Sequence, residues 1–270
     1  MKNSIGVVVA TLICALQFVS SGQAQADIIY QTGFENPPFA LGPIAGQDGW
    51  AVFSGGGTPN AVTIQNAVFF AGSQAVEINT SAATGQTGPY RVDTSPASDT
   101  IVTMQAEVML TSSSVQTAWQ FAGLTGSLGT FFGGFNALAD GTLQIITTGF
   151  PVTTPVITRD VWNLWEVDYD FKTQTFSILI NGSLVAANEP FLNPATAFGT
   201  GLFDTFNATG GNDLGFIDNY SIAGGAAPEP GTFVLFGMGC LILFVSTKMK
   251  RRTFLRASES SSRNTLRFGM

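Results

Sequence analysis

The stretch that decides the fold lies at residues 161–185 and reads VWNLWEVDYDFKTQTFSILINGSLV. Polar and apolar residues alternate over 165–170, which is the period of a strand with one buried face. A second strand-like run, TFSILI, follows at 175–180 and ends at Asn181-Gly182. This pair favours a type I′ turn, because both central residues of that turn need a positive φ. The stretch therefore predicts a β-hairpin in an antiparallel sheet.

The same kind of sequence fills residues 27–223, where short runs rich in Val, Ile, Thr and Phe are separated by Gly, Pro, Asn and Asp. Asp140-Gly141 is a second hairpin signal. No repeat or linker appears before Gly224-Gly225, so we predict one all-β domain, built as a two-sheet sandwich or barrel. Strands are expected at 27–34, 61–70, 74–79, 100–110, 115–124, 141–148, 162–171, 175–181, 183–188 and 214–222.

Composition limits the possible partners and chemistry. The chain has 270 residues, of which 45% are hydrophobic and 11% charged, as expected for a protein with a packed core. Residues 27–229 carry three basic and seventeen acidic residues, a net charge of −14, which makes nucleic acid an unsuitable partner. The chain contains no histidine, so nucleophile–histidine pairs are excluded. Its two cysteines, Cys14 and Cys240, lie outside this region and offer it no disulfide or Cys-based zinc site.

The first 26 residues have the pattern of a secretory signal peptide. Lys2 precedes an apolar run, and Ala24 and Ala26 form an A-x-A cleavage signal. We therefore expect residues 1–26 to be removed during export. An uncleaved N-terminal anchor is the alternative, although the apolar run is shorter than the ~20 residues that span a bilayer.

The C-terminal region combines an apolar run with a cluster of positive charge. Residues 231–247 are apolar and long enough for a short transmembrane helix. Four cations that orient such a helix in the membrane follow at once: Lys248, Lys250, Arg251 and Arg252. The pattern predicts that the body is exported while the tail stays inside the inner membrane; a buried core helix is the alternative.

The triplet Pro228-Glu229-Pro230, the apolar run and the basic cluster together resemble the bacterial PEP-CTERM sorting signal, over residues 224–252. The resemblance implies that an exosortase, a membrane protease, acts near this sorting motif and passes the protein to the cell surface or to exopolysaccharide. Tails of that family usually stop soon after the arginines. Here residues 253–270 continue without apolar periodicity, and we expect them to be disordered.

The body resembles concanavalin-like or laminin-G-like jelly rolls. The quoted stretch is similar to their paired central strands, and GFENPPFALGPIAGQDGW (33–50) and GFIDNYSI (215–222) are similar to their first and last strands. The resemblance implies a jelly-roll sandwich in which the first and last strands lie side by side.

Alternation along residues 162–170 places Glu166, Asp168 and Asp170 on one face of a strand. Retaining β-glucanases with a jelly-roll fold use such a row, with one carboxylate as nucleophile and another as general acid. Their motif is E-x-D-x-x-E, and this chain has E-x-D-x-D. The alternative is that the row is the solvent-facing side of a strand whose other side packs in the core.

A structural Ca²⁺ ion is a second possibility. The resemblance implies that Glu35 of the GFE segment and Asp218 of the IDN segment could hold one together with backbone carbonyls, and Asp48 could add a ligand. The alternative is that these carboxylates accept hydrogen bonds in turns.

Large aromatic side chains that could stack on a sugar are Trp50, Tyr90, Trp119 and Trp162, each of which could equally be part of the core, as expected for most of the 23 phenylalanines. Two functions stay open, and the sequence does not distinguish the first of them from a purely structural matrix component without a ligand. The first is an exported, non-enzymatic surface or matrix protein associated with exopolysaccharide. The second is a secreted glycoside hydrolase or lyase that uses Glu166 and Asp168.

Overall fold

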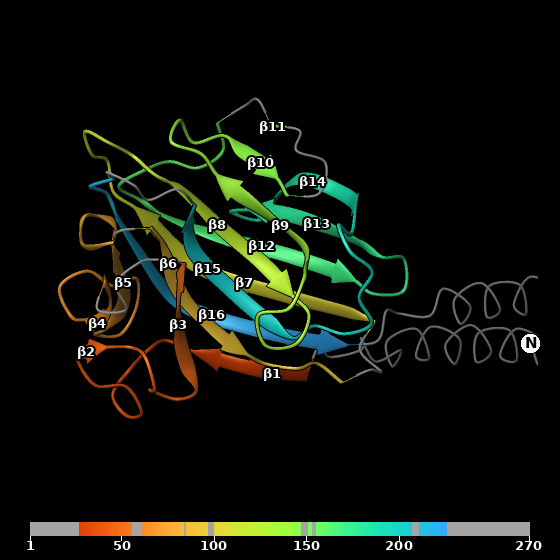
Figure 1. Ribbon diagram of the computed structural model, residues 1–270, viewed down its shortest axis with the longest axis horizontal. Helices are drawn as coiled ribbons and strands as arrows, with labels where there is room; N and C mark the ends of the chain where they lie inside the picture. The colour runs from red at the N-terminus through yellow and green to blue at the C-terminus, as the bar shows by residue number, and fades with distance from the viewer. Residues whose placement is uncertain are drawn as a thin grey trace, which may run out of the picture. The chain divides into compact units, whose positions relative to one another are not determined.

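The computed structural model describes residues 27–55, 61–83, 85–96, 100–146, 151–152, 155–206 and 211–225. These residues form two antiparallel sheets, one in front of the other in Figure 1, which confirms the predicted two-sheet sandwich. The predicted signal peptide (1–26), the predicted sorting motif, the apolar run 231–247 and the tail lie outside the described residues. Within the part of the chain that is described, no helix is long and apolar enough to span a membrane.

The first sheet, here called sheet A, has nine strands among the described residues, in the order β14-β13-β12-β7-β16-β5-β4-β2, with β1 also paired to β16. Their bounds are β1 Asp27–Thr32, β2 Gly42–Pro43, β4 Val62–Gln65, β5 Ala75–Asn79, β7 Ile101–Leu110, β12 Trp162–Asp170, β13 Thr175–Ile180, β14 Ser183–Pro190 and β16 Leu214–Gly225.

The second sheet, sheet B, has seven strands in the described part of the chain, in the order β11-β10-β9-β8-β15-β6-β3. Their bounds are β3 Trp50–Gly55, β6 Gln86–Val92, β8 Ala118–Leu124, β9 Phe131–Ala137, β10 Leu143–Ile145, β11 Pro151–Val152 and β15 Thr200–Phe206. A short 3₁₀ helix, Thr80–Ala82, follows β5.

The quoted stretch forms the predicted hairpin. Strands β13 and β14 pair antiparallel, and the residues between them, Asn181 and Gly182, have φ angles of 52° and 71°. On β12, Trp165, Val167 and Tyr169 are fully buried, whereas the residues between them are half-buried. The alternation in the sequence therefore predicted which face of β12 points into the core.

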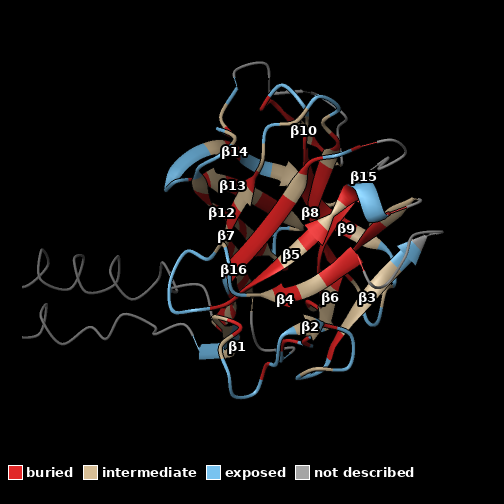
Figure 2. Cartoon of the chain, turned by 90° about the vertical axis from the view of Figure 1, so that its left-hand side faces the viewer, coloured by how far each residue is buried: buried red, intermediate tan, exposed pale blue. Residues whose placement is uncertain are grey.

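The core lies between the sheets and is rich in aromatic rings. Trp165 of sheet A contacts Phe121 and Phe203 of sheet B, with ring centroids 5.9 and 5.5 Å apart. Figure 2 shows buried segments in strands of both sheets, whereas the edge strand β14 is largely exposed. Burial of such rings between two sheets is the main stabilising contribution expected for this fold.

The ends of the body meet as the jelly-roll resemblance implies. Strand β1 pairs antiparallel with β16, so the first and last strands lie side by side. Strand β16 ends at Gly225, two residues beyond the predicted domain end at Ala223. The predicted strand at 61–70 is too long, because β4 ends at Gln65, whose side chain accepts hydrogen bonds from the backbone N–H groups of Ala67 and Val68.

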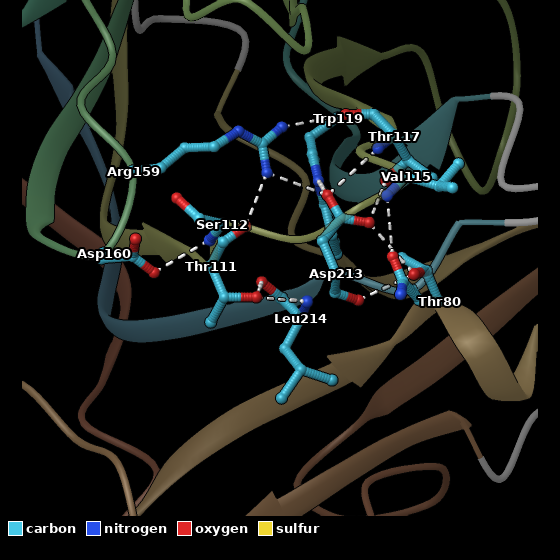
Figure 3. A network of polar contacts seen from close by, with 11 residues as sticks. Thr80, Thr111, Ser112, Val115, Thr117, Trp119, Arg159, Asp160, Asp213 and Leu214 are labelled. Carbon is cyan, nitrogen blue, oxygen red and sulfur yellow. Dashed lines mark hydrogen bonds and ion pairs between the residues drawn. The ribbon is translucent and has the colours of Figure 1, made fainter.

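A buried ion pair ties several loops to the start of β16. Asp213 is fully buried, and one of its oxygens accepts hydrogen bonds from Arg159 at 2.9 Å and from the indole N–H of Trp119 at 3.0 Å (Figure 3). Its carboxylate also accepts from the hydroxyls of Thr80 and Thr117. Burial alone would raise the pKa of Asp213, but these hydrogen bonds outweigh it and hold the pKa below its usual value. We assign this network a structural role, because its carboxylate is fully occupied.

Candidate functional site

The outer face of sheet B carries a row of polar side chains. Trp119, Phe121 and Phe203 contact the core, so the residues that alternate with them on β8 and β15 point to the opposite face. Two of those residues are Gln120 and Asp204, which are directly opposite each other across the β8–β15 pair. Together with their neighbours they form what we call the polar row, which consists of Gln86, Gln120, Asn136, Gln144 and Asp204.

The polar row crosses five neighbouring strands, and its members on β10, β9, β8 and β15 lie opposite one another in register. Gln120 lies opposite Asn136 on β9, and Asn136 lies opposite Gln144 on β10. The side-chain amide of Gln120 donates to Asn136 at 3.0 Å, and the amide of Asn136 donates to Gln144 at 3.2 Å. At the other end, Gln86 of β6 donates to Asp204 at 2.7 Å. The hydrogen bonds fix the orientation of the side chains and leave part of their bonding capacity free.

The middle of the polar row is buried although it lies outside the core. Gln120 and Asn136 are each 6% exposed and Asp204 is 0% exposed, whereas Gln86 and Gln144 are half-buried. Two buried oxygens in the row, Oε1 of Gln120 and Oδ1 of Asp204, have no hydrogen-bond partner among the residues that the structure describes. A buried polar atom without a partner is costly, which makes these two oxygens candidates for contact with a ligand.

Burial raises the pKa of Asp204 well above its usual range, and the hydrogen bond from Gln86 opposes that rise only in part. The nearest residues along the sheet on the same face are small or apolar. Ala122 is paired with Leu202, and Leu202 is paired with the half-buried Tyr90. The outer face of sheet B thus places hydrogen-bonding groups near the half-buried aromatic ring of Tyr90, and ligand sites commonly combine groups of these two kinds.

The predicted carboxylate row lies on the other side of the molecule, on the outer face of sheet A. Glu166 is half-buried, and its pKa is raised by burial and, less strongly, by the neighbouring carboxylate of Asp168. Asp168 accepts a hydrogen bond from the hydroxyl of Thr103. Asp170 accepts hydrogen bonds from the backbone N–H groups of Lys172 and Thr173 at the start of the next turn. The three acids share a face as predicted, but Asp170 serves the turn.

Glu35 and Asp218 are brought to one loop, residues 66–74. Glu35 accepts hydrogen bonds from the backbone N–H groups of Ser73 and Gln74, and Asp218 accepts from those of Phe70 and Ala71. Backbone N–H groups that point at these carboxylates occupy the lone pairs a cation would use. These contacts favour the turn-bonding interpretation, and the calcium site stays a prediction. Among the described residues, no group of three or more Asp, Glu, Cys or His side chains is arranged to hold a metal ion.

Asp48 does not join this pair through any hydrogen bond of its own. Its carboxylate accepts from the hydroxyl of Tyr30 at 2.7 Å and lies 3.8 Å from Arg91. Burial, followed by the hydrogen bond to Asp48, raises the pKa of Tyr30 to about 12. Asp48 thus belongs to a separate cluster of polar and aromatic side chains.

Chelation tests the calcium prediction directly. We expect EDTA to leave the melting temperature of the protein unchanged, because the carboxylates of Glu35 and Asp218 already accept hydrogen bonds from backbone N–H groups. A melting temperature that falls in EDTA and recovers in millimolar Ca²⁺ would instead establish the ion, by mass action on the native state. Asp218→Asn is the informative variant, since it should abolish any such response.

The four aromatic residues proposed for stacking separate into two groups. Trp50 and Trp119 are 3% and 0% exposed and pack in the core, so they are not available to a sugar. Tyr90 lies beside the polar row, and Trp162 on sheet A packs edge-to-face against the exposed Phe70, with ring centroids 5.8 Å apart. Sequence reasoning identified Tyr90 but missed the whole polar row. The available signal was a polar residue between two large aromatics, as in Trp119-Gln120-Phe121.

Comparisons with known proteins add information on the fold. No protein-family model matches the chain, and no curated protein sequence matches it. A solved structure described as a sialidase matches with a TM-score of 0.51 and 10% identity, covering 73% of this chain and 18% of the sialidase. This chain therefore spans less than a fifth of that protein, and the likeness shows a shared fold only.

Two further solved structures match with lower scores. A cellulose-induced protein, Cip1, has a TM-score of 0.49 at 16% identity and covers 72% of this chain and 96% of its own. The catalytic domain of a glycoside hydrolase family 131 protein from Coprinopsis cinerea has a TM-score of 0.47 at 15% identity and covers 76% and 95%. Scores at this level carry no argument about function.

Proposed function

We propose that this protein is exported and sorted to the cell surface or extracellular matrix, where the polar row of sheet B binds a polysaccharide without cleaving it. The observation that supports binding is the continuity of the row across β10, β9, β8, β15 and β6. Neighbouring strands lie about 4.8 Å apart, so five of them place the row across roughly 19 Å. That length suits an extended polymer better than a single sugar.

The chemistry of the row suits sugar hydroxyls. Each Gln or Asn side chain has two N–H donors and a carbonyl acceptor, and a hydroxyl group both donates and accepts. The unpartnered oxygens of Gln120 and Asp204 would each gain a hydrogen bond from a hydroxyl placed over them. The half-buried ring of Tyr90 would supply apolar contact to the less polar face of a sugar ring.

The polar row favours binding over hydrolysis, because Asp204 is its only carboxyl and glycoside hydrolysis generally needs two. The alternative, a glycoside hydrolase or lyase, would instead use Glu166 and Asp168 on sheet A. The raised pKa of Glu166 is the one observation in its favour, since a carboxyl that acts as a general acid needs a pKa above its ordinary value. The two functions are thus assigned to opposite faces of the sandwich.

Sorting rests on the sequence of the two ends. A cleaved signal peptide at 1–26 would start export, and the PEP-CTERM-like segment at 224–252 would hold the chain in the inner membrane until an exosortase acts at Pro228-Glu229-Pro230. The body would then reach the cell surface or exopolysaccharide. The body carries a net negative charge that would repel a phosphate backbone, so the proposal includes no nucleic-acid partner.

We expect Gln120→Ala to weaken binding to a polysaccharide by roughly 5- to 150-fold, because a buried hydrogen bond left unmade costs about 1–3 kcal/mol. Binding is measured by affinity electrophoresis in gels that contain neutral β-glucan, xylan, mannan or galactan. Gln105→Ala is the matched control, since Gln105 is a half-buried glutamine on the outer face of sheet A, opposite Glu166.

The same samples distinguish the two functions. If Gln105→Ala weakens binding and Gln120→Ala does not, the site lies on sheet A and the polar row is not the binding face. If the unmutated protein releases reducing ends from any of these polymers, and Glu166→Gln abolishes that release while its melting temperature is unchanged, the protein is an enzyme. Binding with no release, lost in Gln120→Ala, is the outcome that supports our proposal.

A further inference from the structure

We infer that the polar row takes an uncharged, hydroxyl-rich polysaccharide and rejects polymers that carry carboxylate, sulfate or phosphate groups. This inference rests on the proposed function, since it names the chemical class of the ligand for the same site. It depends on where the few basic residues of the body lie, on the kinds of atom the row presents, and on the net charge around it.

The body between residues 27 and 225 contains only three basic residues, which are Arg91, Arg159 and Lys172. This count comes from the sequence and therefore includes the segments between the described ranges. Whatever conformation those segments adopt, they bring no cation to the polar row. An anionic sugar could therefore pair with a positive charge of the body only through one of these three side chains.

Arg91 points away from the outer face of sheet B. It follows Tyr90 on β6, so alternation places it on the other side of the sheet. Its guanidinium lies over the ring of Tyr30, 3.7 Å from the ring centroid. It also donates to the carboxylate of Asp93 at 2.9 Å and lies 3.8 Å from Asp48. Arg91 is thus balanced by two carboxylates of its own.

The other two cations are also occupied or distant. Arg159 donates to Asp213 and to the backbone carbonyls of Thr111 and Thr117 in the buried network of Figure 3. Lys172 is exposed in the turn between β12 and β13, which belong to sheet A. None of the three is therefore placed to pair with an anion at the polar row.

The atoms of the row also discriminate between ligands. The free oxygen of Gln120 is an acceptor, so it needs a ligand that donates. The free oxygen of Asp204 accepts when the carboxyl is ionised and donates when it is protonated. A hydroxyl group satisfies both oxygens in either state, because it is donor and acceptor at once. A carboxylate or sulfate brings acceptors only, and it would lose its hydration without gaining a positive partner.

The surrounding charge acts in the same direction. Residues 27–229 carry a net charge of −14, and a field of that sign lowers the local concentration of polyanions. Neutral polymers are unaffected by it. The expected selectivity therefore has two sources. At short range, the acceptor oxygen of Gln120 cannot pair with the acceptor oxygens of an anionic group. At longer range, the negative charge of the body repels polyanions, and this repulsion weakens as salt is added.

The test compares polymers that share a backbone and differ in charge. The pairs are hydroxyethyl and carboxymethyl β-1,4-glucan, and fully methyl-esterified and free polygalacturonate. The full chain is used in a detergent without a sugar head group, at moderate and high salt, so that any binding through the basic C-terminal residues is recognised by its loss at high salt. We expect the neutral member of at least one pair to retard the protein at a tenfold or more lower polymer concentration than the charged member.

A variant that adds a cation to the polar row tests whether the lack of a positive charge there causes the preference for neutral polymers. Gln144→Lys adds a cation at the half-buried end of the row, and we expect it to raise affinity for the charged member at least fivefold. Gln105→Lys adds the same cation on sheet A and should change neither affinity. Far-ultraviolet circular dichroism and melting temperatures establish that both variants are folded.

The outcomes separate this inference from the proposed function. Preference for the charged member that persists at high salt and is lost in Gln120→Ala would overturn the inference and leave polysaccharide binding at the polar row intact. Binding to neither member, or binding that Gln120→Ala leaves unchanged, would overturn both.

Discussion

Replacing Arg159 by Met should lower the melting temperature by roughly 6–20 °C. The substitution leaves the buried carboxylate of Asp213 without its cation, and breaking a buried ion pair in this way costs about 3–5 kcal/mol. For a domain of this size, each kcal/mol corresponds to about 2–4 °C. The measurement is thermal unfolding followed by circular dichroism at neutral pH.

The expected loss is large because Arg159 serves several groups at once. Besides Asp213, its guanidinium donates to the backbone carbonyl of Thr111 at 2.8 Å and to that of Thr117 at 3.1 Å. These carbonyls would lose a partner together with the carboxylate. Trp119 and Thr117 would still donate hydrogen bonds to Asp213, so the variant should fold. It would lose the hydrogen bonds by which Arg159 joins Asp213 to Thr111 and Thr117.

Two further variants test whether loss of the ion pair causes the expected fall in melting temperature. Lys172→Met removes an exposed cation from the same body and should leave the melting temperature nearly unchanged, because exposed charges contribute little. Adding Asp213→Asn to Arg159→Met should recover part of the loss, since no buried charge remains. If Arg159→Met melts at the same temperature as Lys172→Met, the network does not stabilise the fold.

The lowered pKa of Asp213 gives the ion pair a defined pH dependence. A carboxyl whose folded-state pKa is below its unfolded value of about 3.9 contributes stability above that value, and the contribution is lost as the pH falls towards the folded-state pKa. The difference in melting temperature between the parent and Arg159→Met should therefore shrink in acid.

Glu229→Ala should abolish processing of the C-terminal segment while leaving export intact. Under our proposal, the exosortase recognises the triplet Pro228-Glu229-Pro230, whose prolines oppose a helix and keep it extended. Without the glutamate, full-length protein should accumulate in the inner membrane of an exosortase-containing host. Fractionation followed by immunoblotting against the body measures the ratio of uncleaved to released protein.

Glu259→Ala is the matched control, because it removes the other acidic residue of the C-terminal region without touching the triplet. If the Glu229→Ala protein is processed as efficiently as this control, the triplet is not the recognition feature.

The orientation of the chain in the membrane should depend on the basic cluster and not on the triplet. Changing Lys248, Lys250, Arg251 and Arg252 to Ser removes cations that each cost about 2.5–3.5 kcal/mol at the centre of a membrane, so some chains should pass through entirely.

Much of sheet A could be predicted from the sequence because its strands alternate plainly. On β12 and β7 every second residue is buried, and the alternation of residue types along both runs is enough to predict a strand at each. Four of the longer strands of sheet B, β3, β6, β9 and β15, were not predicted. Glycines interrupt the patterns of β6, β9 and β15 for reasons that lie elsewhere in the chain: a Cβ atom at Gly133 would lie 2.7 Å from the ring of Phe176, and one at Gly201 would collide with the hydroxyl of Tyr220.

The sequence by itself determined the properties that depend on composition or on neighbouring residues. These are the strand period, the hairpin at Asn181-Gly182, the absence of histidine and the strong negative charge of the body. Each can be read locally, because a turn needs particular φ angles at two adjacent positions and a net charge needs no structure. The sorting signals at the two ends stay predictions.

Only the tertiary structure decided which side chains meet. The polar row joins residues that are far apart in the chain: Gln86 and Asp204 are hydrogen-bonded although 118 positions separate them. The carboxylate of Asp218 likewise accepts a hydrogen bond from the backbone N–H of Phe70, which lies 148 positions away in the chain. Register between distant strands follows from how whole sheets pack, and no local pattern encodes it. The candidate site is therefore a property of the assembled sheet and of no single segment.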